Sequence, residues 1–339
     1  MEKRGEIDFA NVFLCLLVML IHILSKAVSA LDRTSLRFAV VFIPSRLSSF
    51  VVQGFIFLSA VKYFIRYSGG GLDYRDFLKA RIKTVVVPYI IWNIIYYFAL
   101  MPLGYFVFDL GELVRYICIG NMISHFYFVV IIVQFYVLMP FWIWLVRKVR
   151  PSALIIVSLA AMIIFGQYAA RGFAYNDRIF IKYIFYWICG CCAGKYYDRF
   201  IGWIKEHWKL LASVFFAAAV SDGILTWMNT SGIRHVAGLE NIHIAYCTAA
   251  IAFVLAVGAR TYGKLVDKKI FSVINRQSYN IYLSHCLTLY FADFAAERLF
   301  AFGQGGLLVF RMVVCYIGTF VFWGAYDRVK CRKMYKSGC

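Results

Sequence analysis

Long apolar runs, separated by short polar segments, fill most of the chain. At about 1.5 Å of rise per residue, a helix needs about 20 mostly apolar residues to cross a bilayer. Runs of about this length predict membrane-spanning helices at 9–30, 46–65, 85–107, 125–146, 152–169, 180–197, 210–228, 243–260, 279–297 and 306–326. The pattern therefore predicts an all-α, polytopic membrane helical bundle with about ten transmembrane helices.

Composition supports the membrane class. Of the 339 residues, 63% are hydrophobic and 16% are charged, which is more apolar and less charged than a soluble domain. No linker is long enough to separate two soluble domains. We therefore expect residues 1–339 to form a single integral-membrane domain of a multi-pass protein in the cell membrane.

The basic residues predict an orientation. If the N-terminus faces the cytoplasm, the inner segments hold 24 of the 36 lysines and arginines. An excess of basic residues in cytoplasmic segments is the usual rule for membrane proteins. An even number of spans then places both termini in the cytoplasm.

A net charge of +19 raises the question of nucleic-acid binding. The charge is spread over short connections, and no zinc-finger, basic-helix or RNA-binding signature occurs, so we expect no nucleic-acid partner. Anionic lipid head groups and a negatively charged cytoplasmic substrate fit better. The ten cysteines lie mostly inside predicted spans without ligand spacing, so no metal site is expected.

The first predicted span carries its polar residues on one stripe. Asn11, Cys15 and His22 are four and seven residues apart, and such steps return to the same helix face. A stripe of this kind favours a position against other helices or a water-filled cavity over one against lipid. An imidazole there can take a proton from a hydroxyl group and give it back. The alternative is a buried histidine that only bonds a neighbouring carbonyl.

Other predicted spans carry isolated polar groups. Gln53 follows the start of the second span, where helix packing is favoured over a binding role. His125 opens the fourth span near the predicted outer face, where it could contact an acceptor or sit at the wet interface. Tyr282 and His285 share one face of the ninth span and give the bundle a second intramembrane histidine.

A cationic amphipathic segment leads into the third span. Arg81 and Lys83 alternate with apolar residues there, and Pro88 and Tyr89 follow. Lysine and arginine at a helix mouth can hold phosphate groups through charge-assisted hydrogen bonds. They also anchor cytoplasmic helix ends, and spacing alone favours that structural role.

In order and spacing, these features resemble the acyltransferase-3 family of polytopic membrane O-acyltransferases. The resemblance spans nearly the whole chain and rests on Ile7-Asp8, Leu17-Val18 and His22; Gly54-Phe55; Arg81-Ile82-Lys83, Pro88-Tyr89 and Trp92; His125 to Phe128, Tyr136 and Pro140; and Ser278 to His285. The family implies transfer of an acetyl or other short acyl group from cytoplasmic acyl-CoA to a hydroxyl of a sugar, a cell-envelope glycan or a related acceptor. Acyl-CoA is then a co-substrate, and no tightly bound cofactor is expected.

The resemblance also implies site residues. The first-span histidine of the family maps onto His22, which we expect to act as general base, and the basic segment with Arg81, Lys83 and Tyr89 would bind acyl-CoA. Possible substrate or oxyanion contacts are Asn11, Gln53, His125, Tyr282 and His285. Asn11 departs from the family, which usually has arginine eleven residues before the histidine.

Two alternatives stay open. A transporter or flippase of a lipid-linked saccharide would use a cavity with the same polar stripes and basic edges, although no inverted repeat is evident. A catalytically inactive relative that binds a lipid or protein partner is favoured by Asn11. The sequence does not indicate an oligomeric state.

Overall fold

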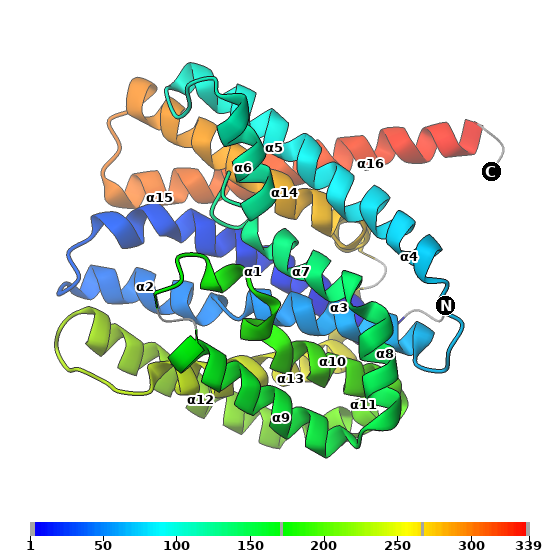
Figure 1. Ribbon diagram of the computed structural model, residues 1–339. Coiled ribbons are helices and arrows are strands. Elements are labelled where there is room, and N and C mark those ends of the chain that lie inside the picture. Colours follow the sequence, from blue (N-terminus) through cyan, green and yellow to red (C-terminus); the bar gives the residue numbers. More distant parts are fainter. Residues whose placement is uncertain (1–3, 170–171, 266–267, 337–339) are drawn as a thin grey trace. The chain divides into compact units, whose positions relative to one another are not determined.

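The computed structural model describes residues 4–169, 172–265 and 268–336, and every regular element in this part of the chain is a helix (Figure 1). The chain divides into two compact units. The first contains Met1–Val51 and Ile204–Cys339, and the second contains Val52–Trp203.

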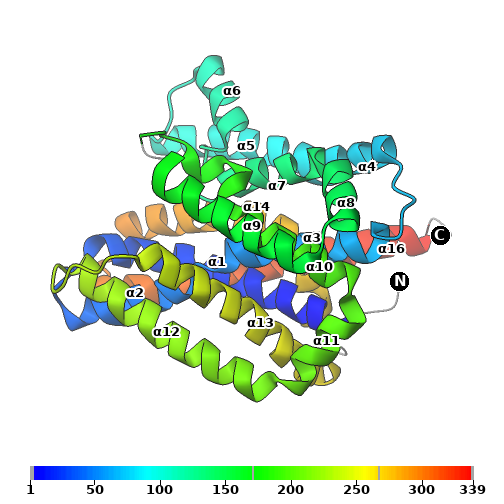
Figure 2. The same cartoon turned by 60° about the horizontal axis from the view of Figure 1, so that its bottom comes forward.

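Helix α1 is central to the first unit. The unit contains α1 (Gly5–Ala30), α2 (Leu36–Ser48), α12 (Trp208–Thr230), α13 (Leu239–Leu265), α14 (Lys269–Leu299), α15 (Gln304–Val313), the π-helical segment Val314–Gly318 and α16 (Thr319–Lys336). Helix α1 packs against α2, α13 and α14, as Figures 1 and 2 show. Its side chains Leu14, Met19 and Ile23 are fully buried, so packing surrounds it along much of its length.

The second unit contains α3 (Val51–Tyr67), α4 (Tyr74–Arg81), π-helix Ile82–Val86, α5 (Val87–Leu100), 3-10 turn Met101–Leu103, α6 (Leu110–Ile119), α7 (Tyr127–Val137), α8 (Met139–Lys148), α9 (Pro151–Ile164), π-helix Phe165–Ala169, 3-10 turns Asn176–Arg178 and Phe180–Tyr183, α10 (Ile184–Lys195) and most of α11 (Tyr197–Glu206). Pro88 has no N–H group to donate to the preceding turn, and the widened π-helical turn lies directly before it.

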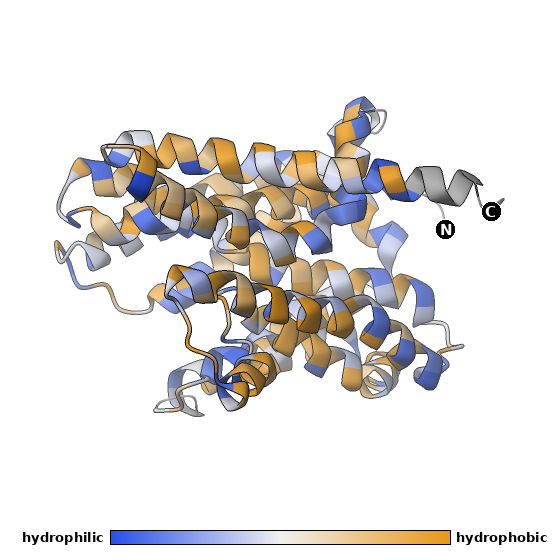
Figure 3. Cartoon of the chain, turned by 90° about the horizontal axis from the view of Figure 1, so that it is seen from above, coloured by the Kyte–Doolittle hydropathy of each residue, from blue (hydrophilic) through white to orange (hydrophobic). Residues whose placement is uncertain are grey.

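Seven helices of the described residues are long and apolar enough to cross a membrane, or eight if the pair α7 and α8, bent by 59°, forms one span. Figure 3 shows hydrophobic colours along the middle of most helices and hydrophilic colours at many helix ends. The all-helical membrane class is confirmed, whereas the number ten and the cytoplasmic placement of both termini stay predictions. The single-domain assignment for 1–339 also stays a prediction.

The predicted start of the second span was wrong. The second span was predicted to begin at residue 46, but α2 already begins at Leu36. Ser35 caps this helix, because its side chain accepts a hydrogen bond from the N–H of Phe38. The charge of Arg46 is tolerated inside the helical segment because it pairs with the buried Asp222 of α12.

Candidate functional site

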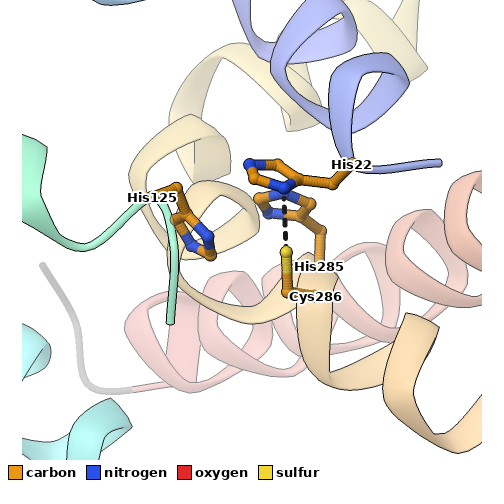
Figure 4. A group of neighbouring side chains, drawn as sticks. All are labelled: His22, His125, His285 and Cys286. Atoms are coloured by element: carbon orange, nitrogen blue, oxygen red, sulfur yellow. Dashed lines mark hydrogen bonds between the residues drawn. The ribbon is translucent and has the colours of Figure 1, made fainter. Parts of the chain in front are cut away.

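Helices α1 and α14 bring two histidines together inside the first unit. The imidazole of His22, from α1, lies with its ring centre 5.2 Å from that of His285, from α14, and the two rings are tilted by 51° (Figure 4). His285 is fully buried, and His22 is partly exposed. The two predicted intramembrane histidines therefore lie side by side.

The main chain of α14 fixes the ring of His285. Its Nδ1 lies 3.1 Å from the carbonyl oxygen of Ile281 and 2.9 Å from that of Tyr282. A nitrogen between two carbonyl oxygens carries the proton, so the neutral ring presents Nε2 as an acceptor. This nitrogen lies 3.5 Å from the Sγ of Cys286. Neutral His285 is thus better suited to accept a proton than to donate one to an oxyanion.

Arg311 of α15 holds the main chain of α1 at His22. Its Nη2 donates to the carbonyl oxygen of His22 at 2.7 Å, and its Nε donates to that of Ile23 at 3.0 Å. Its Nη1 pairs with Asp293 of α14. Arg311 is only 4% exposed, so these three partners satisfy a buried cation and tie α1, α14 and α15 together beside His22.

Arg311 was not among the site residues predicted from sequence. It lies within the predicted span 306–326, and an arginine inside such a run was itself a signal of function. Lys26 adds a second positive charge to this end of α1, with its Nζ 3.5 Å from Asp293 and 2.9 Å from Glu297. Two cations and two carboxylates thus surround the turns of α1 that follow His22.

Asn11 lies on the same helix but in a separate network. Its Nδ2 donates to the Oδ1 of Asn275 at 2.8 Å and to the Oγ of Ser278 at 2.9 Å, both on α14. Eleven helical residues correspond to about 16 Å between Asn11 and His22 along the axis. The stripe on α1 therefore lies against another helix, α14, which Asn11 contacts at a different level from the histidine pair.

Tyr282 is the remaining predicted contact in this unit. It is buried on α14, one turn before His285, and its ring centre lies 6.4 Å from that of His285. Its ring also stacks on Tyr279, with 6.2 Å between the ring centres. Tyr282 is therefore a near neighbour of the histidine pair.

The other predicted site residues belong to the second unit. Arg81 ends α4, where its guanidinium binds the hydroxyl of Tyr63 and lies over the rings of Tyr63 and Phe77. Lys83 is exposed in the π-helical segment that follows. Tyr89 is buried on α5 and donates its hydroxyl to the carbonyl oxygen of Ile117 at 2.7 Å. Arg81 and Lys83 thus lie together, and Tyr89 is committed to a helix contact.

Gln53 and His125 are the two remaining predicted site residues of the second unit. Gln53 is half-buried in α3. His125 is buried just before α7, with its ring edge-on to Phe126 and 4.8 Å between the ring centres. Their participation in a common site with His22 stays a prediction.

The histidine pair also offers metal-ligand chemistry. A nitrogen of His22, a nitrogen of His285 and the Sγ of Cys286 lie within 4.8 Å of one another. Imidazole nitrogen and thiolate sulfur are ligands that zinc prefers, at about 2.0–2.3 Å from the ion. Within this unit the three side chains supply three ligand atoms. Small side-chain movements would have to bring these atoms within bonding distance of one ion.

Comparison with known proteins identifies the class. The family profile described as an acyltransferase domain matches residues 4–326. The chain belongs to this family, the acyltransferase-3 family that its sequence resembles, and is a multi-pass membrane protein.

Two relatives cover most of the chain. A protein of Staphylococcus aureus (strain N315), whose name describes a poly-beta-1,6-N-acetyl-D-glucosamine export protein, is 21% identical over 84% of this chain and 82% of its own. A protein of Bacillus subtilis (strain 168), YfiQ, whose name describes a membrane-bound acyltransferase, is 26% identical over 83% of this chain and 79% of its own. No solved structure matches the chain.

Proposed function

We propose that the protein is a membrane O-acyltransferase that moves an acetyl or other short acyl group from cytoplasmic acyl-CoA to a hydroxyl of a carbohydrate acceptor, with His22 as general base. The observation that carries the proposal is the His22–His285 pair, held beside the buried Arg311. Family membership and the name of YfiQ support the reaction class.

In the proposed reaction, the acceptor hydroxyl attacks the thioester carbonyl while His22 takes the hydroxyl proton. When the tetrahedral intermediate collapses, the carbon–sulfur bond breaks and the proton passes to the departing CoA thiolate. Arg311 acts on His22 through the main chain: its two hydrogen bonds hold the turn of α1 from which the imidazole projects. General-base catalysis of this kind contributes a factor of about 10²–10⁴.

The donor and the acceptor are proposed on separate grounds. Arg81 and the exposed Lys83 lie close together in the chain, and two cations of this kind suit the phosphates of acyl-CoA. The Staphylococcus aureus relative is named for a polysaccharide of N-acetylglucosamine, which offers free hydroxyl groups. A cell-envelope glycan or a lipid-linked saccharide is therefore the proposed acceptor class.

Export of a lipid-linked saccharide is the second candidate. It is favoured by the export function named for the Staphylococcus aureus relative. An exporter would bind the saccharide without consuming acyl-CoA. Thioester turnover therefore separates the two functions.

The test compares wild type with His22→Ala, purified in detergent and supplied with radiolabelled acetyl-CoA and oligosaccharide acceptors. We expect thioester turnover in wild type and a loss of about 10²–10⁴-fold in the variant, while acetyl-CoA binding is retained. His235→Ala is the matched control, because His235 lies exposed in the connection between α12 and α13. If folded wild-type protein neither binds nor consumes acyl-CoA, the enzyme proposal fails and saccharide export becomes the function to measure.

A further inference from the structure

A second polar cluster lies in the first unit, on α2, α12 and α13. Asp222 of α12 is fully buried, and both of its carboxylate oxygens are engaged. Arg46 of α2 donates from Nε to Oδ2 and from Nη2 to Oδ1, each at 3.0 Å. His243 of α13 approaches Oδ2 with its Nδ1, also at 3.0 Å. A carboxylate that binds Nδ1 selects the tautomer whose Nε2 is an acceptor.

A serine and a cysteine meet the other side of this imidazole. The Oγ of Ser49, directly after α2, lies 3.3 Å from the Nε2 of His243. The Sγ of Cys247, one turn further along α13, lies at the same distance from that nitrogen. Ser49 Oγ also donates to the carbonyl oxygen of Arg46 at 2.6 Å, so rotation about one bond would turn its proton to the imidazole.

Ser49, His243 and Asp222 therefore have the relations of an acyl-transfer triad. A hydroxyl contacts a histidine nitrogen, and the opposite nitrogen contacts a buried carboxylate. For burial alone, the two hydrogen bonds from Arg46 already compensate the charge of Asp222. The histidine adds a base between the carboxylate and a nucleophile, which the ion pair does not require.

An apolar cavity lies beside the residues that flank Ser49 in the chain. Its volume is about 340 Å³, and α1, α2, α12 and α13 supply its walls, among them Phe9, Phe13, Phe215 and Val257. Ser48 and Phe50, the two chain neighbours of Ser49, also line it. So does Tyr246, whose ring lies beside that of His243 with 6.0 Å between the ring centres. Apolar cavities of this size are typical small-ligand sites, and these walls fit a hydrocarbon chain.

We propose that Ser49 is a nucleophile that accepts an acyl group from esters with an apolar chain, the chain occupying this cavity. Ser49 Oγ attacks the ester carbonyl, and its proton passes to the Nε2 of His243. The carbon–oxygen bond of the ester then breaks, the alcohol leaves with that proton, and the acyl group stays on Ser49 as a new ester. Asp222 holds the imidazole and stabilises its protonated form. The site stands on residues other than His22 and does not depend on the function proposed for the histidine pair.

The test uses a hexyl fluorophosphonate probe, which forms a covalent bond with activated serines, on the purified full-length protein. Peptide mass spectrometry locates the adduct, and thermal melting of each variant confirms folding. We expect an adduct at Ser49 that is absent from Ser49→Ala. Ser221→Ala is the matched control: Ser221 is an exposed serine beside Asp222 whose hydroxyl donates to a backbone carbonyl in the same way, at 2.9 Å.

Two further variants test the base and the cavity. His243→Gln keeps the Arg46–Asp222 pair and removes the base, so labelling should slow at least tenfold, an order-of-magnitude expectation from triad enzymes. Val257→Phe fills part of the cavity, so labelling by the hexyl probe should fall more than labelling by a methyl probe. Folded wild-type protein without a Ser49 adduct, or a folded His243→Gln variant that labels at the wild-type rate, would overturn the proposal.

Discussion

At the scale of single residues, Arg311 shows how a buried charge can act through the backbone. Its guanidinium reaches the carbonyl oxygens of His22 and Ile23 together with the carboxylate of Asp293. A planar guanidinium can serve three partners at once, whereas the ammonium of lysine is a point charge on a flexible stem. The position beside His22 thus depends on the geometry of arginine as well as on its charge.

Arg311→Lys should therefore lower kcat while leaving KM for acyl-CoA close to the wild-type value. We expect a decrease of about tenfold, because a displacement of about 1 Å at a catalytic group can cost up to 10²-fold. Steady-state kinetics in detergent measure the two constants. Arg33→Lys, at an exposed residue between α1 and α2, is the control. A variant that raises KM alone would assign Arg311 to substrate binding instead.

For Asn11 we predict an effect on stability, because its hydrogen bonds join two helices. Its amide donates to Asn275 and Ser278 of α14, and the residue is 8% exposed. Asn11→Ala leaves these half-buried groups without that partner and should destabilise the fold by about 1–3 kcal/mol. Thermal melting should show the loss, whereas Ser29→Ala, at an exposed site on the same helix, should not. Lost acyl-CoA binding with unchanged melting would instead make Asn11 a substrate contact.

The histidine pair could be anticipated from sequence, and the residues around it only in part. His22 and His285 stand out because a polar group in an apolar run must face protein or water. The partners of Arg311 could not be predicted, because two of them are backbone carbonyl oxygens, which every residue carries. The cluster of Ser49, His243 and Asp222 could not be predicted, because Ser49 lies far from the other two residues in the sequence.

At the scale of elements, glycines set how closely helices approach. Gly190 and Gly194 lie one turn apart on α10, and a Cβ atom added to them would lie 2.5 Å from the carbonyl oxygen of Phe57 and 2.6 Å from that of Val61, both on α3. The two helices therefore pack backbone to backbone, as small residues four apart permit in membranes. The span 180–197 was predicted from sequence, but this close approach was not.

Gly194→Ala should separate α10 from α3 and cost about 1–3 kcal/mol, as overpacking typically does. The partner atom is backbone, so no side chain can rotate away. Gly202→Ala is a matched control, because nothing lies within 4 Å of a Cβ added there. Thermal melting of both variants measures the difference. Equal melting temperatures would show that α10 and α3 can separate without cost.

Prolines mark two of the helix irregularities, whereas the error at the start of α2 comes from a distant contact. Pro88 lies in the first turn of α5, and a π-helical turn directly precedes this helix. The predicted span 125–146 is instead bent by 59° between α7 and α8, at Leu138, two residues before Pro140. The predicted start at residue 46 came too late because Arg46 imitates a polar connection when its distant partner, Asp222, is unknown.

For the molecule as a whole, the number of membrane crossings depends on whether α14 spans the bilayer. It is 31 residues long, about 45 Å at 1.5 Å per residue, which exceeds the roughly 30 Å of a hydrocarbon core. It is not among the helices apolar enough to count as spans. Its polar groups, however, bond within the unit: Ser278 to α1, Ser284 to Trp323 of α16 and His285 to its own main chain. A helix whose polar groups are satisfied in this way can cross a membrane despite its composition.

We therefore expect α14 to cross the membrane, with the connection after Leu299 outside and both termini in the cytoplasm. Alkaline phosphatase inserted after Gly303 of the full chain should be active, because this enzyme matures only outside the cytoplasm. Green fluorescent protein fused to either terminus should fluoresce, because it matures inside. The excess of lysine and arginine in the predicted inner segments is the physical reason for this orientation. Reporters that place the two termini on opposite sides would require an odd number of spans and exclude the predicted ten.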